Sequence, residues 1–324
     1  KITAWVHNSR IELVKNEHYW DAGKVKMPKI DFLLTESGST EIAMFDNNQI
    51  DMGENAPPAE YPRLKKEGRL QISPYLGTYF FAFNVTKAPL DNLKVRKALS
   101  LAIDRRAIID NVTKGEQKPA MAWVPPGMAD ASSADDFRAI GGDFFQDRDI
   151  ETAKKLLAEA GYPDGRGLPA IELIYNTNDV HKAIAEAVQE MWRKNLGVNV
   201  SLTNQEWKVF INTRSKGGYQ IARHGWIGDY ADPMTFIDMF DSTSGNNDSQ
   251  YKNPQYDNFV RLAKSTGNQE IRMKAMHSAE KLLLDDAVIA PVYFYTRVSM
   301  VKPNVKGYQR SVLGHVYFKE AYVE

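Results

Sequence analysis

The chain contains no cysteine, no excess of charge of either sign and no apolar run long enough to cross a bilayer. The missing cysteines exclude a disulfide framework, a thiolate metal site and a cysteine nucleophile, and they fit an oxidising extracytoplasmic setting. The 41 basic and 41 acidic residues balance, which argues against a nucleic-acid partner or an acidic membrane surface held by bulk charge. With 43% hydrophobic and 25% charged residues, the composition is that of a soluble globular protein.

Catalytic and cofactor motifs are also missing. The six histidines are scattered without zinc-ligand spacing, and the chain has no Gly-x-Gly-x-x-Gly fingerprint, P-loop or Gly-x-Ser-x-Gly elbow. The carboxylate pairs at 135–136 and 285–286 are sequence neighbours, and neighbours do not face each other on a helix or a strand. We therefore predict no cofactor, no metal and no catalytic site.

The chain opens on a strand-like segment, with neither an initiator methionine nor a signal peptide. We interpret it as a fragment or processed product whose upstream sequence is missing. Its 324 residues suffice for one large domain or two ordinary ones.

Hydrophobic periodicity and capping residues predict an α/β fold. Residues 171–175 and 198–202 are expected to form parallel strands joined by a helix that begins at Asn178 or Asp179 and ends at Gly197. The other expected elements are a hairpin over 1–15, strands at 29–36, 50–52, 75–84 and 288–301, helices at 40–48, 95–109, 149–161 and 268–285, and a long loop at 118–147.

Residues 219–233 carry the strongest functional signal. A strand-like run ends in a Gly-Trp-x-Gly-Asp turn, which places the indole of Trp226, the carboxylate of Asp229 and exposed backbone side by side. Arg214 and Arg223 lie just upstream. One anion and two cations at fixed points suit a ligand with an amine at one end and a carboxylate at the other, as in a peptide.

Each of these residues also has an ordinary structural explanation. Asp229 can bond its own turn, and Arg223, in an apolar strand, needs a partner that is more often an internal carboxylate than a ligand. Arg214 is expected to be solvated, and the first-turn His181 to lie on the surface. Trp207 and Trp226 can be core aromatics or the flat walls of a binding cleft.

Several blocks of the sequence resemble the extracytoplasmic oligopeptide-binding proteins of ABC importers, a large solute-binding family that includes dipeptide and nickel binders. The resemblance runs essentially end to end. It rests on residues 16–21 (NEHYWD), 95–99 (VRKAL), 102–105 (AIDR), 153–157 (AKKLL), 175–182 (YNTNDVHK), 195–198 (NLGV), 205–208 (QEWK) and Gly225-Trp226 followed by Asp229-Tyr230.

The resemblance implies a periplasmic-binding-protein-like (type II) two-lobed clamp whose N-terminal part is missing here. Residues 1–78 and 297–324 would form part of the first lobe, and 79–296 the second. Asp229 would receive the peptide α-ammonium group, and Arg223 and His181 its C-terminal carboxylate, with Arg214 lining the same cleft. Trp207 and Trp226 would flank side-chain pockets, Gly225 and Ile227 would pair with the ligand backbone, and Asn55 and Tyr75 would contribute from the first lobe. Some relatives carry a disulfide across positions matching Gly77 and Ile227, which this chain lacks.

The implied function is a non-enzymatic, monomeric receptor that binds short peptides outside the cytoplasm and delivers them to the membrane permease of an ABC importer. In that setting it would be periplasmic or a lipoprotein on the outer face of the membrane. The alternatives are the same fold with a dipeptide, metal chelate or signalling peptide as ligand, and a hydrolase.

Overall fold

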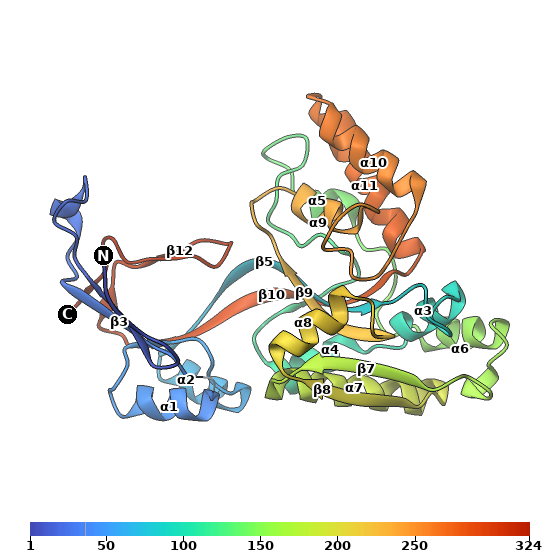
Figure 1. Cartoon of the computed structure of the whole chain (residues 1–324), viewed down its shortest axis with the longest axis horizontal. Coiled ribbons are helices and arrows are strands. Elements are labelled where there is room, and N and C mark those ends of the chain that lie inside the picture. The colour runs from blue at the N-terminus through green and yellow to red at the C-terminus, as the bar shows by residue number, and fades with distance from the viewer. Residues whose placement is uncertain (36) are drawn as a thin grey trace. The chain divides into compact units, whose positions relative to one another are not determined.

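The computed structural model describes residues 1–35 and 37–324, so Glu36, at the end of the predicted strand 29–36, lies outside the described residues. The chain divides into two compact units, which are coloured by residue number in Figure 1. Unit 1 comprises Lys1–Tyr75, Lys114–Glu116 and Thr296–Glu324, and unit 2 comprises Leu76–Thr113 and Gln117–Tyr295. The strands β5 (Leu70–Phe83) and β10 (Ile289–Val301) each run from one unit into the other. The division of a two-lobed clamp after residues 78 and 296, expected from the sequence, remains a prediction.

Unit 1 contains a three-stranded antiparallel sheet and two short helices. The predicted hairpin is present as β1 and β2, and β3 extends it. Helix α1 begins where the Ser37 hydroxyl accepts the Thr40 N–H, as expected of an N-cap. The elements are β1 (Ile2–Val6), β2 (Arg10–Val14), η1 (Ala22–Lys24), β3 (Lys29–Leu33), α1 (Gly38–Asp46), β4 (Met52–Gly53), η2 (Pro58–Glu60), α2 (Tyr61–Lys66), β11 (Val305–Lys306), β12 (Gln309–Arg310), β13 (Val316–Tyr317) and β14 (Tyr322–Val323).

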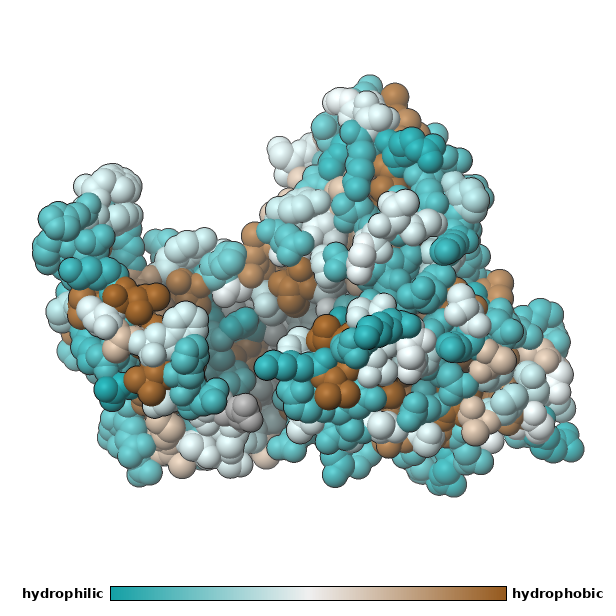
Figure 2. All heavy atoms as spheres, in the orientation of Figure 1, coloured by the Kyte–Doolittle hydropathy of each residue, from teal (hydrophilic) through white to brown (hydrophobic). Residues whose placement is uncertain are grey.

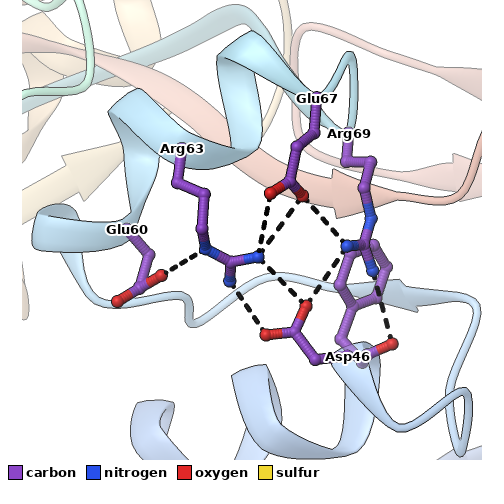
Figure 3. Close-up of polar contacts among 6 residues, drawn as sticks. Asp46, Glu60, Arg63, Glu67 and Arg69 are labelled. Carbon is purple, nitrogen blue, oxygen red and sulfur yellow. Dashed lines mark hydrogen bonds and ion pairs between the residues drawn. The ribbon is translucent and has the colours of Figure 1, made fainter.

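A charged network joins helices α1 and α2 (Figure 3). Arg63 binds Glu60 at 2.8 Å and Asp46 at 2.9 Å, and its Nη1 also contacts the carboxylate of Glu67. Arg69 also binds Asp46 and Glu67. Because these side chains are partly exposed, solvent screens the network and each ion pair contributes little to stability.

Unit 2 has an α/β architecture, and the strands of its sheet lie in the order β10-β5-β9-β7-β8. Strands β7 and β8 pair in parallel over their whole length and are joined by α7, which confirms the predicted strand–helix–strand unit. The elements are α3 (Leu93–Leu101), α4 (Arg105–Ile108), η3 (Ile109–Thr113), β6 (Lys118–Pro119), α5 (Phe137–Gly141), α6 (Ile150–Glu159), η4 (Pro163–Gly165), β7 (Ile171–Asn176), α7 (Asp179–Leu196), β8 (Val200–Gln205), α8 (Trp207–Ser215), β9 (Ile221–Ile227), α9 (Met234–Ile237), η5 (Asp238–Phe240), α10 (Pro254–Ser265) and α11 (Gln269–Asp285).

A hydrophobic core of unit 2 fills the space between this sheet and helices α3, α6 and α7. Trp192 of α7 is fully buried there, and its indole N–H donates to the Leu99 carbonyl at 2.8 Å. The face drawn in Figure 2 is mainly hydrophilic, with hydrophobic residues in small groups. The core holds the strands that carry the candidate site in fixed register.

Apart from shifted strand and helix ends, two predicted segments differ from the structure in the elements that they contain. The helix expected over 95–109 is two helices, α3 and α4, because Asp104 leaves the helical backbone and caps α4 by accepting the Ala107 N–H at 2.8 Å. The expected loop at 118–147 contains the short strand β6 and helix α5. Helix α5 begins at another side-chain cap, in which Asp136 accepts the Ala139 N–H at 3.0 Å.

Candidate functional site

Strand β9 presents one partly open edge. It pairs with β5 along its full length, but its parallel pairing with β7 is limited to Leu173↔Ile221 and Ile174↔Ala222. The later part of β9 therefore has no strand partner on the β7 side among the residues that the structure describes. Unpaired strand edges are the sites at which an extended peptide can add as a further strand.

The antiparallel register shows which residues of β9 face that edge. The Gly228 N–H donates to the Leu76 carbonyl, so the even-numbered residues of this region bond β5 and the odd-numbered ones face away from it. The backbone groups of Arg223, Gly225 and Ile227 therefore point toward the open edge. The Gly225 N–H also lies 2.8 Å from Nδ1 of His224, so a ligand strand would share or replace that contact.

Two glycines leave no room for a side chain here. A Cβ at Gly225 would lie 2.5 Å from the Tyr295 hydroxyl oxygen. A Cβ at Gly77 would lie 2.3 Å from Cδ1 of Ile227, its partner across the β5–β9 pair. Positions 77 and 227 are thus joined by a tight glycine–isoleucine contact.

Asp229 follows β9 and lies on a pocket of about 550 Å³ within unit 2. Its backbone N–H donates to the Thr235 hydroxyl at 3.1 Å, while its exposed carboxylate has no hydrogen-bond or ion-pair partner among residues 1–35 and 37–324. The carboxylate does not bond its own turn, so that ordinary explanation is wrong. The other lining residues are Trp226, Tyr230, Thr235, Asp238, Asp241, Thr243, Ser244, Asn246, Asp257, Val260, Arg261 and Lys264.

Arg223 has neutral partners. One terminal nitrogen is 3.4 Å from Oδ1 of Asn176, the other donates to the Tyr295 hydroxyl at 3.1 Å, and the guanidinium lies over the ring of Tyr79. Its Nε is buried and has no hydrogen-bond partner among the residues that the structure describes. The internal carboxylate expected from the sequence is absent from the described part of the chain, and that expectation is wrong. Burial opposes the charge, but the phenolic oxygens of Tyr295 and Tyr79 outweigh it and hold the pKa of Arg223 above its ordinary value.

His181 belongs to the same cluster. Asn178 caps α7 by accepting the N–H groups of Val180 and His181, which places the imidazole 5.6 Å from the ring centre of Tyr79. The side chain is partly buried, and its Nδ1 has no hydrogen-bond partner in the described part of the chain, so the expected surface position is wrong. Burial, reinforced by the charge of Arg223, holds the pKa of His181 well below its ordinary value and keeps the ring neutral.

Arg214 is neither solvated nor free. It is in the last turn of α8, where its Nε binds Oδ2 of Asp248 at 2.5 Å with both side chains largely buried. The expectation of a solvated arginine is therefore wrong. Burial lowers the pKa of Arg214 from its ordinary value while Asp248 opposes that effect.

The two tryptophans differ in exposure. Trp207, at the start of α8, is 51% exposed and stacks on Phe210 with ring centres 6.2 Å apart, so a core position is wrong for it. Trp226 is partly buried on the Asp229 pocket, and its indole N–H has no partner among the described residues. Contact of either indole with a ligand remains a prediction.

Asn55 and Tyr75 belong to unit 1. The buried carboxylate of Glu41 accepts the backbone N–H and the side-chain amide of Asn55, each at 2.9 Å. Tyr75 accepts from Arg297 at 3.4 Å, and Arg297 in turn pairs with Glu54. Internal bonds therefore hold both predicted residues in place.

Sequence reasoning missed Asn176, Tyr79, Tyr295 and Asp248. Asn176 lies at the carboxyl end of β7, where polar residues often form sites, and this position was the available signal. The two tyrosines were hidden within apolar strands. The described residues contain no group of three or more His, Asp or Glu suited to a metal ion, and none of their helices has the length and apolar composition needed to span a membrane.

A family model described as bacterial extracellular solute-binding proteins, family 5, matches residues 1–248. The chain belongs to this family. The oligopeptide-binding protein OppA of Bacillus subtilis is 42% identical over 332 residues, covering 99% of this chain and 60% of the relative. The family-5 chain thus spans about 60% of the length of that curated relative.

Solved structures of family members confirm the fold. A periplasmic oligopeptide-binding protein of Borrelia burgdorferi superposes with a TM-score of 0.89 at 32% identity, covering 100% of this chain and 64% of that one. OppA of Haemophilus influenzae, in a complex with the peptide RPPGFSPFR, superposes with a TM-score of 0.84 at 35% identity, covering 100% of this chain and 64% of that one. The predicted α/β periplasmic-binding-protein fold of this family-5 chain is therefore confirmed.

Proposed function

We propose that this chain is the peptide-binding portion of a solute receptor that delivers short peptides to the permease of an ABC importer. One observation carries the proposal. Among the residues that the structure describes, a carboxylate without a partner, Asp229, and a cation without a carboxylate partner, Arg223, flank the open edge of β9. A peptide in extended form supplies the two complementary charges and the backbone groups for the edge.

The dimensions of β9 are compatible with such a ligand. A strand advances about 3.4 Å per residue, so the four steps from Arg223 to Ile227 cover roughly 14 Å, the length of a peptide of a few residues. In this arrangement Asp229 binds the ligand ammonium group, and Arg223 with His181 binds its carboxylate. The Gly225 and Ile227 backbones pair with the ligand main chain, which reads no side chain, while Trp226 and Trp207 bound its side chains.

The remaining parts of the proposal rest on the family and on the relatives. Asn55 and Tyr75 contribute from unit 1, and the protein acts as a monomeric receptor without enzymatic activity. It acts outside the cytoplasm, in the periplasm or as a lipoprotein on the outer face of the membrane. The family model describes extracellular solute-binding proteins, which supports that location.

Calorimetric titration of this chain with Ala-Ala-Ala and with its N-acetylated twin tests the proposal. We expect heat of binding from the free-amine peptide and much weaker binding of the acetylated one, which cannot pair with Asp229. Equal binding of both would point to a different ligand class. Hydrolysis of either peptide, followed by chromatography of the same mixture, would contradict the assignment of a non-enzymatic receptor.

A further inference from the structure

The side chain of Tyr295 reaches from β10 across β5 to the candidate site on β9. In the sheet, β5 lies between β10 and β9. A Cβ at Gly77 of β5 would lie 2.9 Å from Cδ2 of Tyr295, and a Cβ at Gly225 of β9 would lie 2.5 Å from its hydroxyl oxygen. The tyrosine therefore lies directly against the backbone of two neighbouring strands, which is possible because both positions are glycine.

The strand register places both glycines on the face of the sheet that carries Arg223. Gly225 is opposite Tyr79 in the β5–β9 pair. Opposed residues of an antiparallel pair share a face, as do alternate residues of one strand. Gly77, Gly225 and Arg223 therefore lie on one face. The side chain of Tyr295 covers the two glycines and ends beside the arginine, whose Nη2 donates to the tyrosine hydroxyl at 3.1 Å.

Arg223 is held by two tyrosines in different ways. Its guanidinium carbon lies 5.0 Å from the ring centre of Tyr79, a contact that sets the distance from the ring but little else. The hydrogen bond to Tyr295 is directional, and it is shorter than the 3.4 Å contact of Nη1 with Asn176. Because a long arginine side chain has many rotamers, a bond that selects one of them before the ligand arrives lowers the entropy cost of binding.

We propose that Tyr295 is a positioning residue for the ligand carboxylate, because its hydroxyl orients the Arg223 guanidinium and the glycines at 77 and 225 provide the room that lets it do so. This inference rests on the proposed function and refines it. A neutral hydroxyl suits this role, since it directs the arginine without cancelling the charge that the ligand carboxylate needs. Loss of the hydroxyl therefore weakens recognition of the carboxyl end of the ligand and leaves the ammonium end, at Asp229, as it was.

The substitution Tyr295→Phe tests this role, because it removes the hydroxyl and keeps the ring over the two glycines. The probes are Ala-Ala-Ala, its C-terminal amide and its N-acetylated form, each titrated by calorimetry. The readouts are two ratios of dissociation constants: amide over acid reports on Arg223, and acetylated over free amine reports on Asp229. We expect the first ratio to fall about tenfold, since a hydrogen bond to a charged group is lost, and the second to keep its wild-type value.

Tyr256→Phe is the matched control. It also removes the hydroxyl of a fully buried tyrosine, which donates to the Ile237 carbonyl at 2.5 Å, so both variants lose one internal hydrogen bond of a phenol. We expect this control to lower the free energy of unfolding and to leave both ratios unchanged.

An amide-to-acid ratio that is unchanged in Tyr295→Phe would overturn the inference. A rise in that ratio would also overturn it, because it would show that the hydroxyl competes with the ligand for Arg223. Equal changes in both ratios would show a general disturbance of the site and would have the same consequence. These outcomes leave the proposed function standing if wild type binds Ala-Ala-Ala and prefers the acid to the amide. Wild type that binds none of the three peptides contradicts the proposed function and this inference with it.

Discussion

The guanidinium carbon of Arg223 lies 5.0 Å from the ring centre of Tyr79, and no carboxylate among residues 1–35 and 37–324 pairs with this arginine. A partly buried cation held by an aromatic face and neutral oxygens keeps its capacity for a strong, charge-assisted bond. In the proposed function, Arg223 would therefore bind the ligand carboxylate and Asp229 its ammonium group.

Replacing Arg223 by Gln should remove the discrimination between a free peptide acid and its amide. The expected loss for Ala-Ala-Ala is about 2–5 kcal/mol, because the ligand carboxylate would lose its charged partner, while the amide should lose much less. Titration calorimetry of both peptides measures the difference. Equal losses for acid and amide would show that the substitution disturbs the site generally.

Gly225→Ala should weaken peptide binding and destabilise unit 2. The added Cβ would lie 2.5 Å from the Tyr295 hydroxyl oxygen, so β9 or the tyrosine must shift, at a cost of about 1–3 kcal/mol. Removing that hydroxyl with Tyr295→Phe should restore part of both losses. The control is Gly23→Ala, since a Cβ at Gly23 meets no atom within 4 Å. No loss of affinity in Gly225→Ala would argue against pairing of the ligand at this edge.

Arg105→Met should be among the most destabilising single substitutions in unit 2. The fully buried guanidinium donates to the carbonyls of Ala120, Pro291 and Ser100, which would lose their partners. We expect a loss of about 3–5 kcal/mol in the free energy of unfolding, measured by urea denaturation. The neighbouring Arg106→Met, at an exposed side chain, should change it by less than about 0.5 kcal/mol.

The free energy of unfolding should already fall as the pH drops from about 6.5 to about 4, above the range in which most carboxylates titrate. Burial lowers the pKa of His224 from 6.5 to about 4, so the unfolded chain binds a proton between these values that the folded chain does not. Stability therefore rises with pH across that window, and His224 contributes a change of about 3 kcal/mol. His181 acts in the same direction, whereas the lowered pKa of Asp248 acts only below 3.8.

The matched variant for this pH dependence is His224→Phe, which keeps a ring stacked on Phe80. Urea unfolding at a series of pH values from 7 to 4 should show a smaller slope than in wild type, with the part due to His181 remaining. An identical slope in both proteins would contradict the buried, neutral state of His224.

Local chemistry explains what the sequence predicted well. The run that ends in Gly225-Trp226 forms β9, and Asn178 and Gly197 bound α7, because strand alternation and capping depend on neighbours along the chain. The partner of Arg214 could not be predicted in the same way. Asp248 lies 34 residues further on, and only the packing of the fold brings the two together.

The difference between local signals and contacts made by packing also explains two wrong predictions, the surface position of His181 and the single helix over 95–109. The first turn of α7 is exposed in an isolated helix, but here the imidazole of His181 is partly buried and lies against the ring of Tyr79. The apolar spacing of 95–109 continues across Asp104, yet its side chain favours capping the next helix over extending the previous one.

The most direct test of the account is the cost of N-acetylating Ala-Ala-Ala, measured by titration calorimetry in wild type, Asp229→Asn and Asp257→Asn. Asp257 lines the same pocket, and its asparagine keeps the oxygen that accepts the Ser242 N–H, so it controls for charge alone. We expect Asp229→Asn to weaken free-amine binding by about 2–5 kcal/mol and to abolish the acetylation penalty, with Asp257→Asn close to wild type. Unchanged affinity of Asp229→Asn for the free-amine peptide would contradict the assignment of Asp229 as the ammonium anchor.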